Sequence, residues 1–477
     1  MSVDEKINAW LAPVADWFGK VIFFSVPVAG AQLPLIMAWL IMGGIVCTLA
    51  FRFVNLRGFR HSLHVIRGDY SSKDHAGEAT PFQALSTAVS GTVGLGSIGG
   101  VAIAVTLGGP GAAFWMVIAG FLGMSTKFAE VTLSVKHRIT RPDGSVSGGA
   151  MYYVPIALQK VGMPRLGKFL AGFFCVAAVG GSLTIFQVNQ AWVQFHAVTG
   201  YEQGIVFGLI TAAWVAFVLF GGVKRIVQWT DKLSPFMCLL YVAACVVVLA
   251  ANFSHIPAAF GAIFREAFVP DAVAGGVVGA LIQGFRRASF ANEAGLGSAP
   301  MAHAMVRTNE PMSQGFAALI EPFLDTVIIC LLTALVIVVT GVYQTSASDG
   351  IALTSDAFAT VVPWFPIVLA VVAILFALST VLAWGYYGEQ AWTWLFSGRK
   401  GSRLAYRVFL CAALSVAPVF ERDQVTSIVD SLTFAGSIPN LIAVYLLLPE
   451  LRAELAQYWR RVVLRLPPDQ VPVENPK

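Results

Sequence analysis

The sequence predicts an all-α membrane protein with about eleven helices that cross the bilayer. Three observations support this fold class. Hydrophobic residues make up 57% of the 477-residue chain and charged residues only 12%, whereas soluble globular proteins carry about 25% charged residues. Apolar segments long enough to span a bilayer recur along the chain. Two of these segments contain clustered glycines or buried charges, which a plain lipid-facing helix does not carry.

The apolar segments are separated by short polar connections, and no connection is long enough to form a soluble domain. The predicted spans are Leu33–Phe51, Pro81–Leu107, Ala112–Val135, Phe169–Phe195, Ile205–Gly222, Leu233–Asn252, Ala272–Gly297, Gly315–Val342, Val361–Tyr386, Ala405–Phe420 and Val425–Leu448. The aromatic, amphipathic stretch Trp10–Phe24 precedes them, either as an interfacial helix or as an extension of the first span. The first twenty residues lack a basic start and a cleavage site, so no removable signal peptide is expected.

Basic residues gather in every second connection between the spans. The first connection is basic through Arg52, Arg57, Arg60, Arg67 and Lys73, whereas residues 343–360 contain no lysine or arginine. Basic connections stay on the cytoplasmic side of a membrane. We therefore expect a plasma membrane protein (the inner membrane in a bacterium) with an outside amino terminus and a cytoplasmic carboxyl terminus.

The second span contains five glycines in the eleven residues Ser90–Gly100. Each glycine costs a helix about 1 kcal/mol relative to alanine, so we expect a discontinuous helix. In such a helix the unwound backbone offers carbonyl groups to a cation, and a half-helix N-terminus offers N–H groups to a carboxylate. The alternative is close helix packing, because Gly96 and Gly100 form a GxxxG spacing.

The seventh span is irregular for a different reason, since it carries Gln283, Arg286, Arg287, Asn292 and Glu293. Charge inside a membrane is costly and usually faces a cavity or a partner. We expect a second discontinuous helix here. The alternative is that the span ends near Gln283 and the remainder is a cytoplasmic loop.

The positions of the two irregular spans suggest an internal repeat. With residues 1–79 as an added span and basic link, residues 80–252 and 272–449 form two units of five spans, and 450–477 form a tail. Two five-span units in series have opposite orientations, which is the inverted-repeat plan of secondary transporters. The whole chain is thus expected to be one transmembrane domain, 1–477.

Specific motifs occur in a fixed order between about Pro81 and Pro449. They are Thr92–Ser97, Gly108–Ala112, Gly123–Glu130, Ser147–Tyr153, Gly221–Arg225, Ser289–His303, Asp325–Thr326 and Trp384–Glu389. In these motifs the chain resembles the alanine/glycine:cation symporter family, also called the sodium:alanine symporter family. The resemblance implies a LeuT-like 5+5 inverted repeat with an extra amino-terminal span, and sodium-driven import of a small neutral amino acid such as alanine or glycine.

Two residues depart from the motifs of that family. Ser97 stands where the family usually has asparagine, and Ala150 stands where it usually has proline. A serine hydroxyl is a shorter and weaker cation ligand than an asparagine carbonyl. We therefore expect Ser97 to alter either sodium affinity or the range of substrates.

The expected substrate site combines the first broken helix with two other spans. Its N–H groups and Gln187 would hold the substrate carboxylate, and Trp384 would bound the side-chain pocket. The predicted substrate-binding residues are Thr92, Gly94, Gly96, Ser97, Gln187, Thr380 and Trp384. The alternative for Gln187 and its neighbour Asn189 is hydrogen bonding between helices.

The resemblance implies that the coupling ion is Na⁺, and a hard cation of this kind takes oxygen ligands. The predicted ligands are the carbonyl groups of Gly91, Val93 and Gly94 with the hydroxyls of Ser379 and Thr380. Thr380 and Trp384 stand four residues apart and so share one helix face. The alternative is that the two hydroxyls bond only to carbonyls of their own helix.

Buried charge leaves a second mechanism open. Glu321 and Asp325 are also four residues apart, and they form either a proton relay or ion pairs with Arg286 or Arg287. No nucleotide-binding, zinc-protease or nucleic-acid signature is present, so neither an enzyme nor a nucleic-acid partner is expected. The sequence therefore predicts a sodium-coupled amino-acid symporter, with a proton-coupled carrier or a non-transporting amino-acid sensor as alternatives.

Overall fold

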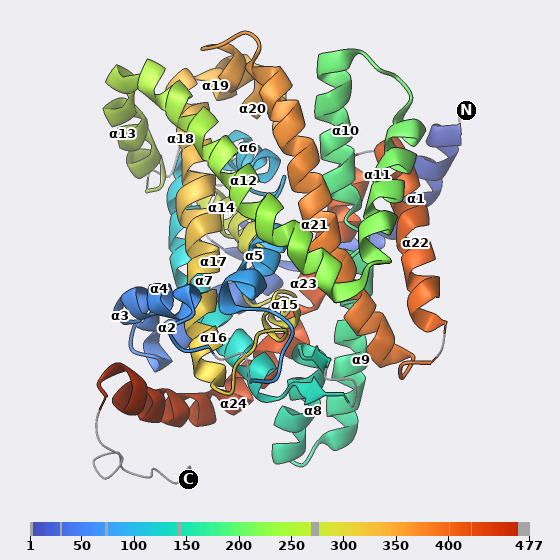
Figure 1. Ribbon diagram of the computed structural model, residues 1–477. Coiled ribbons are helices and arrows are strands. Elements are labelled where there is room, and N and C mark those ends of the chain that lie inside the picture. Colours follow the sequence, from blue (N-terminus) through green and yellow to red (C-terminus); the bar gives the residue numbers. More distant parts are fainter. Residues whose placement is uncertain are drawn as a thin grey trace.

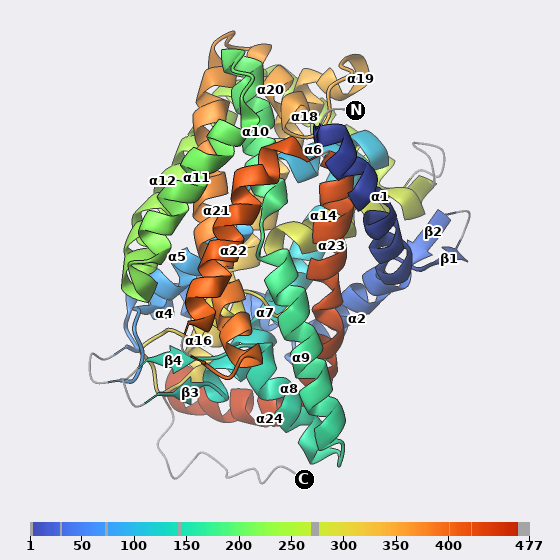
Figure 2. The ribbon, with the colours of Figure 1, turned by 90° about the vertical axis from the view of Figure 1, so that its right-hand side faces the viewer.

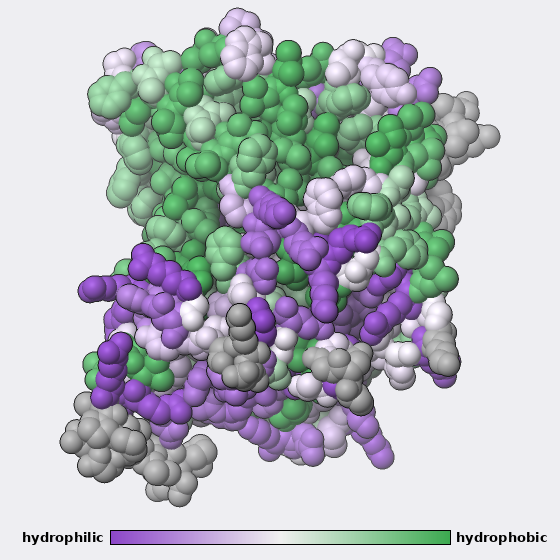
Figure 3. Space-filling view, viewed as in Figure 1, coloured by the Kyte–Doolittle hydropathy of each residue, from purple (hydrophilic) through white to green (hydrophobic). Residues whose placement is uncertain are grey.

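The computed structural model describes residues 3–28, 31–71, 75–141, 145–268, 276–399, 401–420 and 422–465. These residues form a helical bundle whose long helices run between its two ends (Figures 1 and 2). In the view of Figure 3, apolar residues cover the upper part of the bundle and hydrophilic residues cover the lower end. This division fits a protein embedded in a bilayer.

The amino-terminal part begins with a helix that is separate from the first span. Its elements are α1 (Val3–Ile22), β1 (Ser25–Val28), β2 (Ala31–Pro34), α2 (Leu35–Ala50), α3 (Val54–Arg57) and α4 (Phe59–Arg67). The antiparallel hairpin β1–β2 stands between α1 and α2, so the stretch predicted at Trp10–Phe24 does not extend the first span. Figure 2 shows α1 along the side of the bundle next to α23 (Arg422–Ala435), against which it packs.

The first half of the bundle follows this region. It consists of α5 (Pro81–Thr92), α6 (Gly99–Gly108), α7 (Gly111–Lys136), β3 (Ile139–Thr140), β4 (Val146–Ser147), α8 (Ala150–Lys160), α9 (Pro164–Gly181), α10 (Ile185–Thr199), α11 (Gly204–Leu219), α12 (Gly222–Ala251), η1 (Phe253–His255) and α13 (Ile256–Glu266).

The second half completes the bundle. It consists of α14 (Gly276–Asn292), α15 (Pro300–His303), α16 (Pro311–Ala318), α17 (Ile320–Pro322), η2 (Phe323–Cys330), α18 (Leu331–Thr340), α19 (Val342–Thr345), α20 (Ile351–Ala359), α21 (Phe365–Leu395), α22 (Ser402–Val416), η3 (Ala417–Val419), α23, α24 (Ser437–Tyr458) and η4 (Trp459–Val463).

Seven helices in the described residues are long and apolar enough to cross a membrane, so the protein is an integral membrane protein. They correspond to the third, fourth, sixth and eighth to eleventh predicted spans. The remaining four predicted spans form helices too short to be counted among these seven. The first and fifth form helices of 16 residues, and the second and seventh are interrupted. The count of eleven spans and the 5+5 repeat stay predictions.

Both predicted interruptions are present. The second span is divided at residues 93–98 between α5 and α6, and the seventh is divided at residues 293–299 between α14 and α15. The alternative of a loop beginning near Gln283 is wrong, because α14 continues to Asn292, and Arg287, Ser289 and Asn292 are buried. Buried glycines in the first interruption also permit close approach, so the packing explanation holds alongside the break.

Three features of the other spans were not predicted. The fourth span is also divided, between α9 and α10, at Thr184 with φ of +47°. The eighth span contains the π-helical turn η2, which carries Asp325. The last predicted span straddles two helices, α23 and α24, which meet at Gly436.

The two predicted five-span units pack against each other throughout the bundle. Helix α14 contacts α6 and α7, and α21 contacts α5, α9, α10 and α12. These contacts bring both interrupted helices to the middle of the bundle. The proposed boundaries at residues 79, 252, 272 and 449 stay predictions.

Candidate functional site

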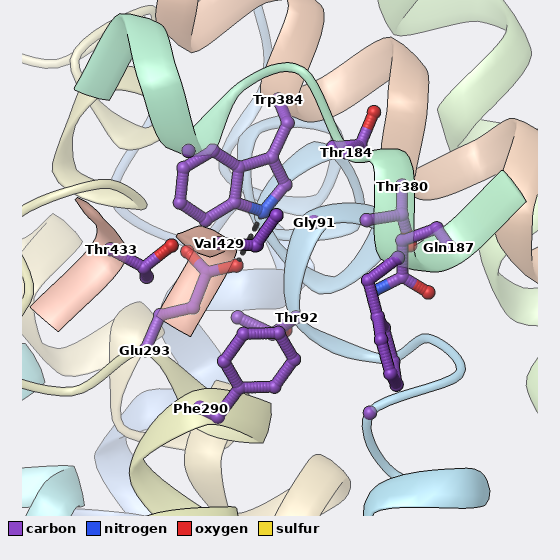
Figure 4. A pocket seen from close by; sticks show the side chains of 13 residues that line it. Gly91, Thr92, Thr184, Gln187, Phe290, Glu293, Thr380, Trp384, Val429 and Thr433 are labelled. Carbon is purple, nitrogen blue, oxygen red and sulfur yellow. Dashed lines mark hydrogen bonds between the residues drawn. The ribbon is translucent and has the colours of Figure 1, made fainter. Parts of the chain in front are cut away.

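A small pocket lies where the two interrupted helices meet (Figure 4). Its free volume is about 20 Å³, which is close to the space that one water molecule needs. The residues that line it come from α5 and α14 with the interruptions that follow them, from α9–α10, and from α21 and α23. They are Gly91, Thr92, Gly96, Gly181, Thr184, Phe186, Gln187, Phe290, Glu293, Thr380, Trp384, Val429 and Thr433.

Carbonyl groups in the first interruption lack their helical hydrogen bonds, in part because Gln187 accepts a main-chain N–H that would otherwise donate to one of them. Leu95 N donates to Gln187 Oε1 at 2.9 Å, although in a continuous helix it would donate to the carbonyl of Gly91. Ser97 N donates to Gly94 O at 3.0 Å, which similarly deprives Val93 O of its helical partner. Two of the three predicted carbonyl ligands, at Gly91 and Val93, therefore lose their helical partners, and the third, at Gly94, already accepts one bond.

Helix α21 presents the hydroxyl of Thr380 to this interruption, and Ser379 precedes it in the chain. Thr380 Oγ1 and Ser379 Oγ are buried and have no hydrogen-bond partner within the described residues. The alternative that they bond to carbonyls of their own helix is therefore wrong. A Cβ placed on Gly94 would meet Thr380 Oγ1 at 2.7 Å, so only glycine permits this approach. Buried unpaired hydroxyls beside freed carbonyls have the donor chemistry of a sodium site.

The second interruption brings Glu293 to the pocket. Glu293 is 2% exposed, and its φ of +56° is uncommon for a residue with a side chain. Trp384 Nε1 donates to Glu293 Oε1 at 2.8 Å, and Ser298 Oγ donates to Oε2. Figure 4 shows Glu293 and the Trp384 ring on one side of the pocket, with Gln187 and Thr380 on the other. A carboxylate held in this way is a counter-charge for a cationic group.

Thr92, Gly96, Gln187, Thr380 and Trp384 line the pocket, as the sequence predicted for the substrate site. Gly94 lies next to Thr380 and Gln187 but outside the lining residues. The role of each residue stays a prediction. Asn189 lies elsewhere, since its Nδ2 donates to Phe420 O at 2.8 Å and so joins α10 to the end of η3.

Ser97 points away from the pocket and towards Asp325. Ser97 Oγ donates to Asp325 Oδ1, and Thr326 Oγ1 donates to Asp325 Oδ2 at 2.8 Å. Asn292 Nδ2 in turn donates to Thr326 Oγ1 at 3.0 Å. A chain of hydrogen bonds thus joins the first interruption to the second through η2, and Ser97 contributes to this chain instead of to the pocket wall.

Glu321, unlike Asp325, belongs to a buried ionic cluster. Lys127 Nζ lies 3.3 Å from Glu321 Oε1 and 3.9 Å from Glu130 Oε1. His303 Nε2 lies 3.2 Å from Glu321 Oε2, while its Nδ1 lies 2.7 Å from Gln314 Nε2. The amide donates to Nδ1, so Nε2 carries the proton that points at Glu321.

The predicted pairing of Glu321 or Asp325 with Arg286 or Arg287 is wrong. Both arginines instead pair with Asp430 of α23, at 3.1 and 3.3 Å. Asp430 lies in a predicted span, and the sequence alone does not reveal which helix packs against it. Glu389 accepts two bonds from Arg407 of α22 at 2.7 and 2.9 Å.

Several pocket residues carried no role in the sequence prediction. Glu293 was visible as an intramembrane acid, which was the signal available for it. Thr184, Phe186, Val429 and Thr433 lack such a signal, because single hydroxyl or apolar residues are ordinary in membrane helices. The break of the fourth span and the packing of α23 bring them to the pocket.

Comparisons with known proteins identify the family to which the chain belongs. The profile of the sodium:alanine symporter family matches residues 23–468. The sodium/alanine symporter AgcS of Methanococcus maripaludis is 35% identical over 87% of this chain and 92% of its own length. The probable sodium/glutamine symporter GlnT of Bacillus subtilis is 32% identical over 90% of this chain and 88% of its own length.

A solved structure supports the fold. The crystal structure of MhsT in complex with L-phenylalanine matches with a TM-score of 0.53 at 17% identity, and the match covers 80% of this chain and 89% of that chain. At this identity the likeness concerns the fold alone. The family profile spans nearly the whole chain and its relatives are matched over most of their length, so this protein belongs to the sodium:alanine symporter family.

Proposed function

We propose that this protein is a sodium-coupled symporter that imports a small neutral amino acid by alternating access. The observation that carries the proposal is the small pocket between two interrupted helices, which combines freed main-chain groups with one buried carboxylate. Membership of the family and the sodium symporters among its relatives support sodium coupling. The residues of the pocket support a small neutral amino acid as the substrate.

The two charged groups of an amino acid have separate partners in the pocket. Because Leu95 N–H occupies Gln187 Oε1, the Gln187 amide N–H₂ remains to donate to the substrate carboxylate. Glu293 accepts the substrate ammonium group, and Trp384 and Ser298 hold its carboxylate in position. A zwitterion satisfies both partners, and the aromatic walls at Phe186 and Phe290 favour a small apolar side chain.

Sodium binds beside this pocket in the proposal. Its ligands are the carbonyl oxygens of Gly91 and Val93 with the hydroxyls of Ser379 and Thr380, and Gly94 O contributes its second lone pair. These atoms come from α5 with the interruption that follows it, and from α21, and α5 and α21 pack against each other. An ion that binds one arrangement of these helices more tightly shifts the protein towards that arrangement, and so couples sodium to substrate movement.

The test is uptake into proteoliposomes that contain the purified full-length protein. An inward sodium gradient should drive accumulation of radiolabelled alanine or glycine, and collapse of the gradient should abolish it. Glu293→Gln should lose most uptake because the ammonium partner is neutralised. Glu202→Gln, which changes an exposed acid away from the pocket, should behave as wild type. Binding of an amino acid without any uptake would instead support the sensor alternative.

Proton coupling through Asp325 is the second candidate. Glu321 pairs with the Lys127 ammonium group and accepts a hydrogen bond from His303, whereas the fully buried Asp325 accepts from the hydroxyls of Ser97 and Thr326. A buried carboxylate with hydroxyl partners favours a bound proton or cation. Uptake driven by a pH gradient without sodium, and lost in Asp325→Asn, would replace sodium coupling with this mechanism.

A further inference from the structure

A second cavity lies between the first connection and the end of the chain, far from the substrate pocket in sequence. It has a volume of about 390 Å³ and is lined by Arg57 and Arg60 of α3 and α4, and by Trp459 and Arg465 of the carboxyl-terminal segment. We refer to it as the basic cavity. In Figure 1 the dark red end of α24 lies below α3 and α4, and hydrophilic residues cover this region in Figure 3.

The charge of the basic cavity is positive and largely unneutralised. Its lining contains three arginines and one acid, Asp69, so its formal charge is 3 − 1 = +2 with neutral histidines. Asp69 Oδ2 already accepts from His64 Nδ1 at 3.0 Å. Neither Arg60 nor Arg465 has a hydrogen-bond or ionic partner in the part of the chain that the structure describes. An anion would satisfy these guanidinium groups.

One arginine of the basic cavity, Arg57, is held in place. The Arg57 guanidinium lies 4.8 Å from the centre of the Trp459 ring, in a cation–π contact. Next to it, His61 Nε2 and Tyr458 OH lie 2.9 Å apart, which joins α4 to the end of α24. Burial, with a smaller contribution from His64, lowers the pKa of His61 to about 4, so arginines supply the positive charge at neutral pH. Guanidinium groups fixed in this way favour phosphate.

The surroundings of the basic cavity favour a lipid over a soluble anion. Residues next to its lining in the sequence are large, apolar and exposed, namely Leu56 at 61%, Leu63 at 43% and Leu464 at 55% exposure. Val462 and Val463 also form part of its wall. Helix α3 follows directly after α2, an apolar helix, so the basic cavity lies near the expected membrane surface. Basic sites at such positions suit anionic headgroups.

We propose that the basic cavity binds the phosphate of an anionic phospholipid headgroup and thereby holds the carboxyl-terminal helix against α4. The phosphate contacts Arg57, Arg60 and Arg465, while the glycerol and upper acyl chains lie along the valines and the exposed leucines. This site is separate from the substrate pocket, and it does not depend on the transport activity proposed above.

The experiment is native mass spectrometry of the full-length protein in detergent, titrated with phosphatidylglycerol, with phosphatidylcholine, or with glycerol 1-phosphate. We expect phosphatidylglycerol to bind in preference to phosphatidylcholine. Arg57→Gln and Arg60→Gln should each weaken phosphatidylglycerol binding about fivefold, since one basic residue contributes about that factor near an anionic lipid. Arg60→Lys keeps the charge and should retain most of the binding. The matched control is Arg452→Gln, which removes an exposed arginine of α24 outside the cavity.

Each outcome bears on the proposal. Equal weakening in Arg452→Gln and Arg60→Gln would overturn it, because the effect would then reflect general surface charge. Binding of glycerol 1-phosphate as tight as that of phosphatidylglycerol would show that the acyl chains contribute nothing, and would overturn the lipid assignment in favour of a soluble phosphate ligand. Thermal unfolding of each variant without lipid separates loss of binding from loss of folding. A variant that unfolds early is replaced by Arg465→Gln, which lies at the exposed end of the cavity.

Discussion

At the scale of single residues, the pocket depends on polar atoms that a continuous helix would have satisfied. Gln187 accepts from Leu95 N–H in place of the Gly91 carbonyl, and Thr380 has a buried hydroxyl without a partner in the described structure. Buried polar groups are usually paired. Those that are not, at the junction of two interrupted helices, are therefore the atoms most ready to meet an ion or a substrate.

Thr380→Val removes one of these hydroxyls at nearly constant volume. Loss of one cation ligand costs roughly 1 to 3 kcal/mol, so the half-saturating sodium concentration should rise about fivefold or more, with Ser379→Ala having a similar effect. Uptake measured over a range of sodium concentrations gives the half-saturating value. Thr393→Val is the control, because Thr393 lies on the same helix and donates to Glu389 O. Unchanged sodium curves for both Thr380→Val and Ser379→Ala would exclude these two hydroxyls as ligands.

Ser97→Asn tests the departure from the family motif. Because Ser97 bonds to Asp325, the longer amide should act through that carboxylate and the chain to Asn292. We expect higher sodium affinity or a substrate range narrowed towards alanine and glycine. The change in binding free energy should be roughly 1 to 3 kcal/mol, which is the contribution of one contact. Sodium half-saturation and a substrate panel, measured beside wild type, provide the test. Identical values in a well-expressed variant would mean that Ser97 is a neutral replacement.

At the scale of elements, buried ionic groups join the interrupted helices to their neighbours. Lys127 of α7 pairs with Glu321 of α17, and Glu130 of α7 accepts from Gly295 N at 3.3 Å and from Asn440 Nδ2 at 2.7 Å. Glu130 thus ties the second interruption to α24. These contacts hold the unwound segment of residues 293–299 between α7 and α24. Unwound backbone in a membrane needs such protein partners because no water is there to bond it.

Lys127→Met should destabilise the protein strongly, because it leaves Glu321 and Glu130 buried without their cation. Removal of one partner of a buried pair costs about 3–5 kcal/mol. The double variant Lys127→Met with Glu321→Gln should recover part of this loss. Thermal unfolding in detergent measures both, with Lys168→Met, an exposed lysine, as the control. A double variant as unstable as the sum of the two single variants would show that Lys127 and Glu321 are not coupled.

At the scale of the whole molecule, the expected orientation in the membrane rests on the distribution of charge along the chain. The basic connections alternate with connections that have few or no basic residues. The helices α19 and α20, between residues 341 and 360, occupy one such connection, and the basic cavity lies in the first basic connection. The positive-inside rule places these two regions on opposite sides of the membrane.

Cysteine labelling in intact cells tests this orientation. A cysteine introduced at exposed Ala347 should react with a membrane-impermeant maleimide, whereas one at exposed Ser397 should react only after the cells are permeabilised. Mass spectrometry of the labelled peptides separates these sites from the native cysteines. The reverse pattern would place the amino terminus in the cytoplasm.

The sequence by itself determined the membrane class, the family and both interrupted helices, because low charge, glycine clusters and intramembrane acids are local properties of the chain. It also identified Gln187, Thr380 and Trp384 as candidate site residues, and all three line the pocket. Only the tertiary structure decided that Glu293 faces Trp384, that Ser97 faces Asp325, and that Arg286 and Arg287 pair with Asp430. The physical reason is that a buried side chain takes its partner from another helix, and the sequence of one helix does not reveal which neighbour packs against it.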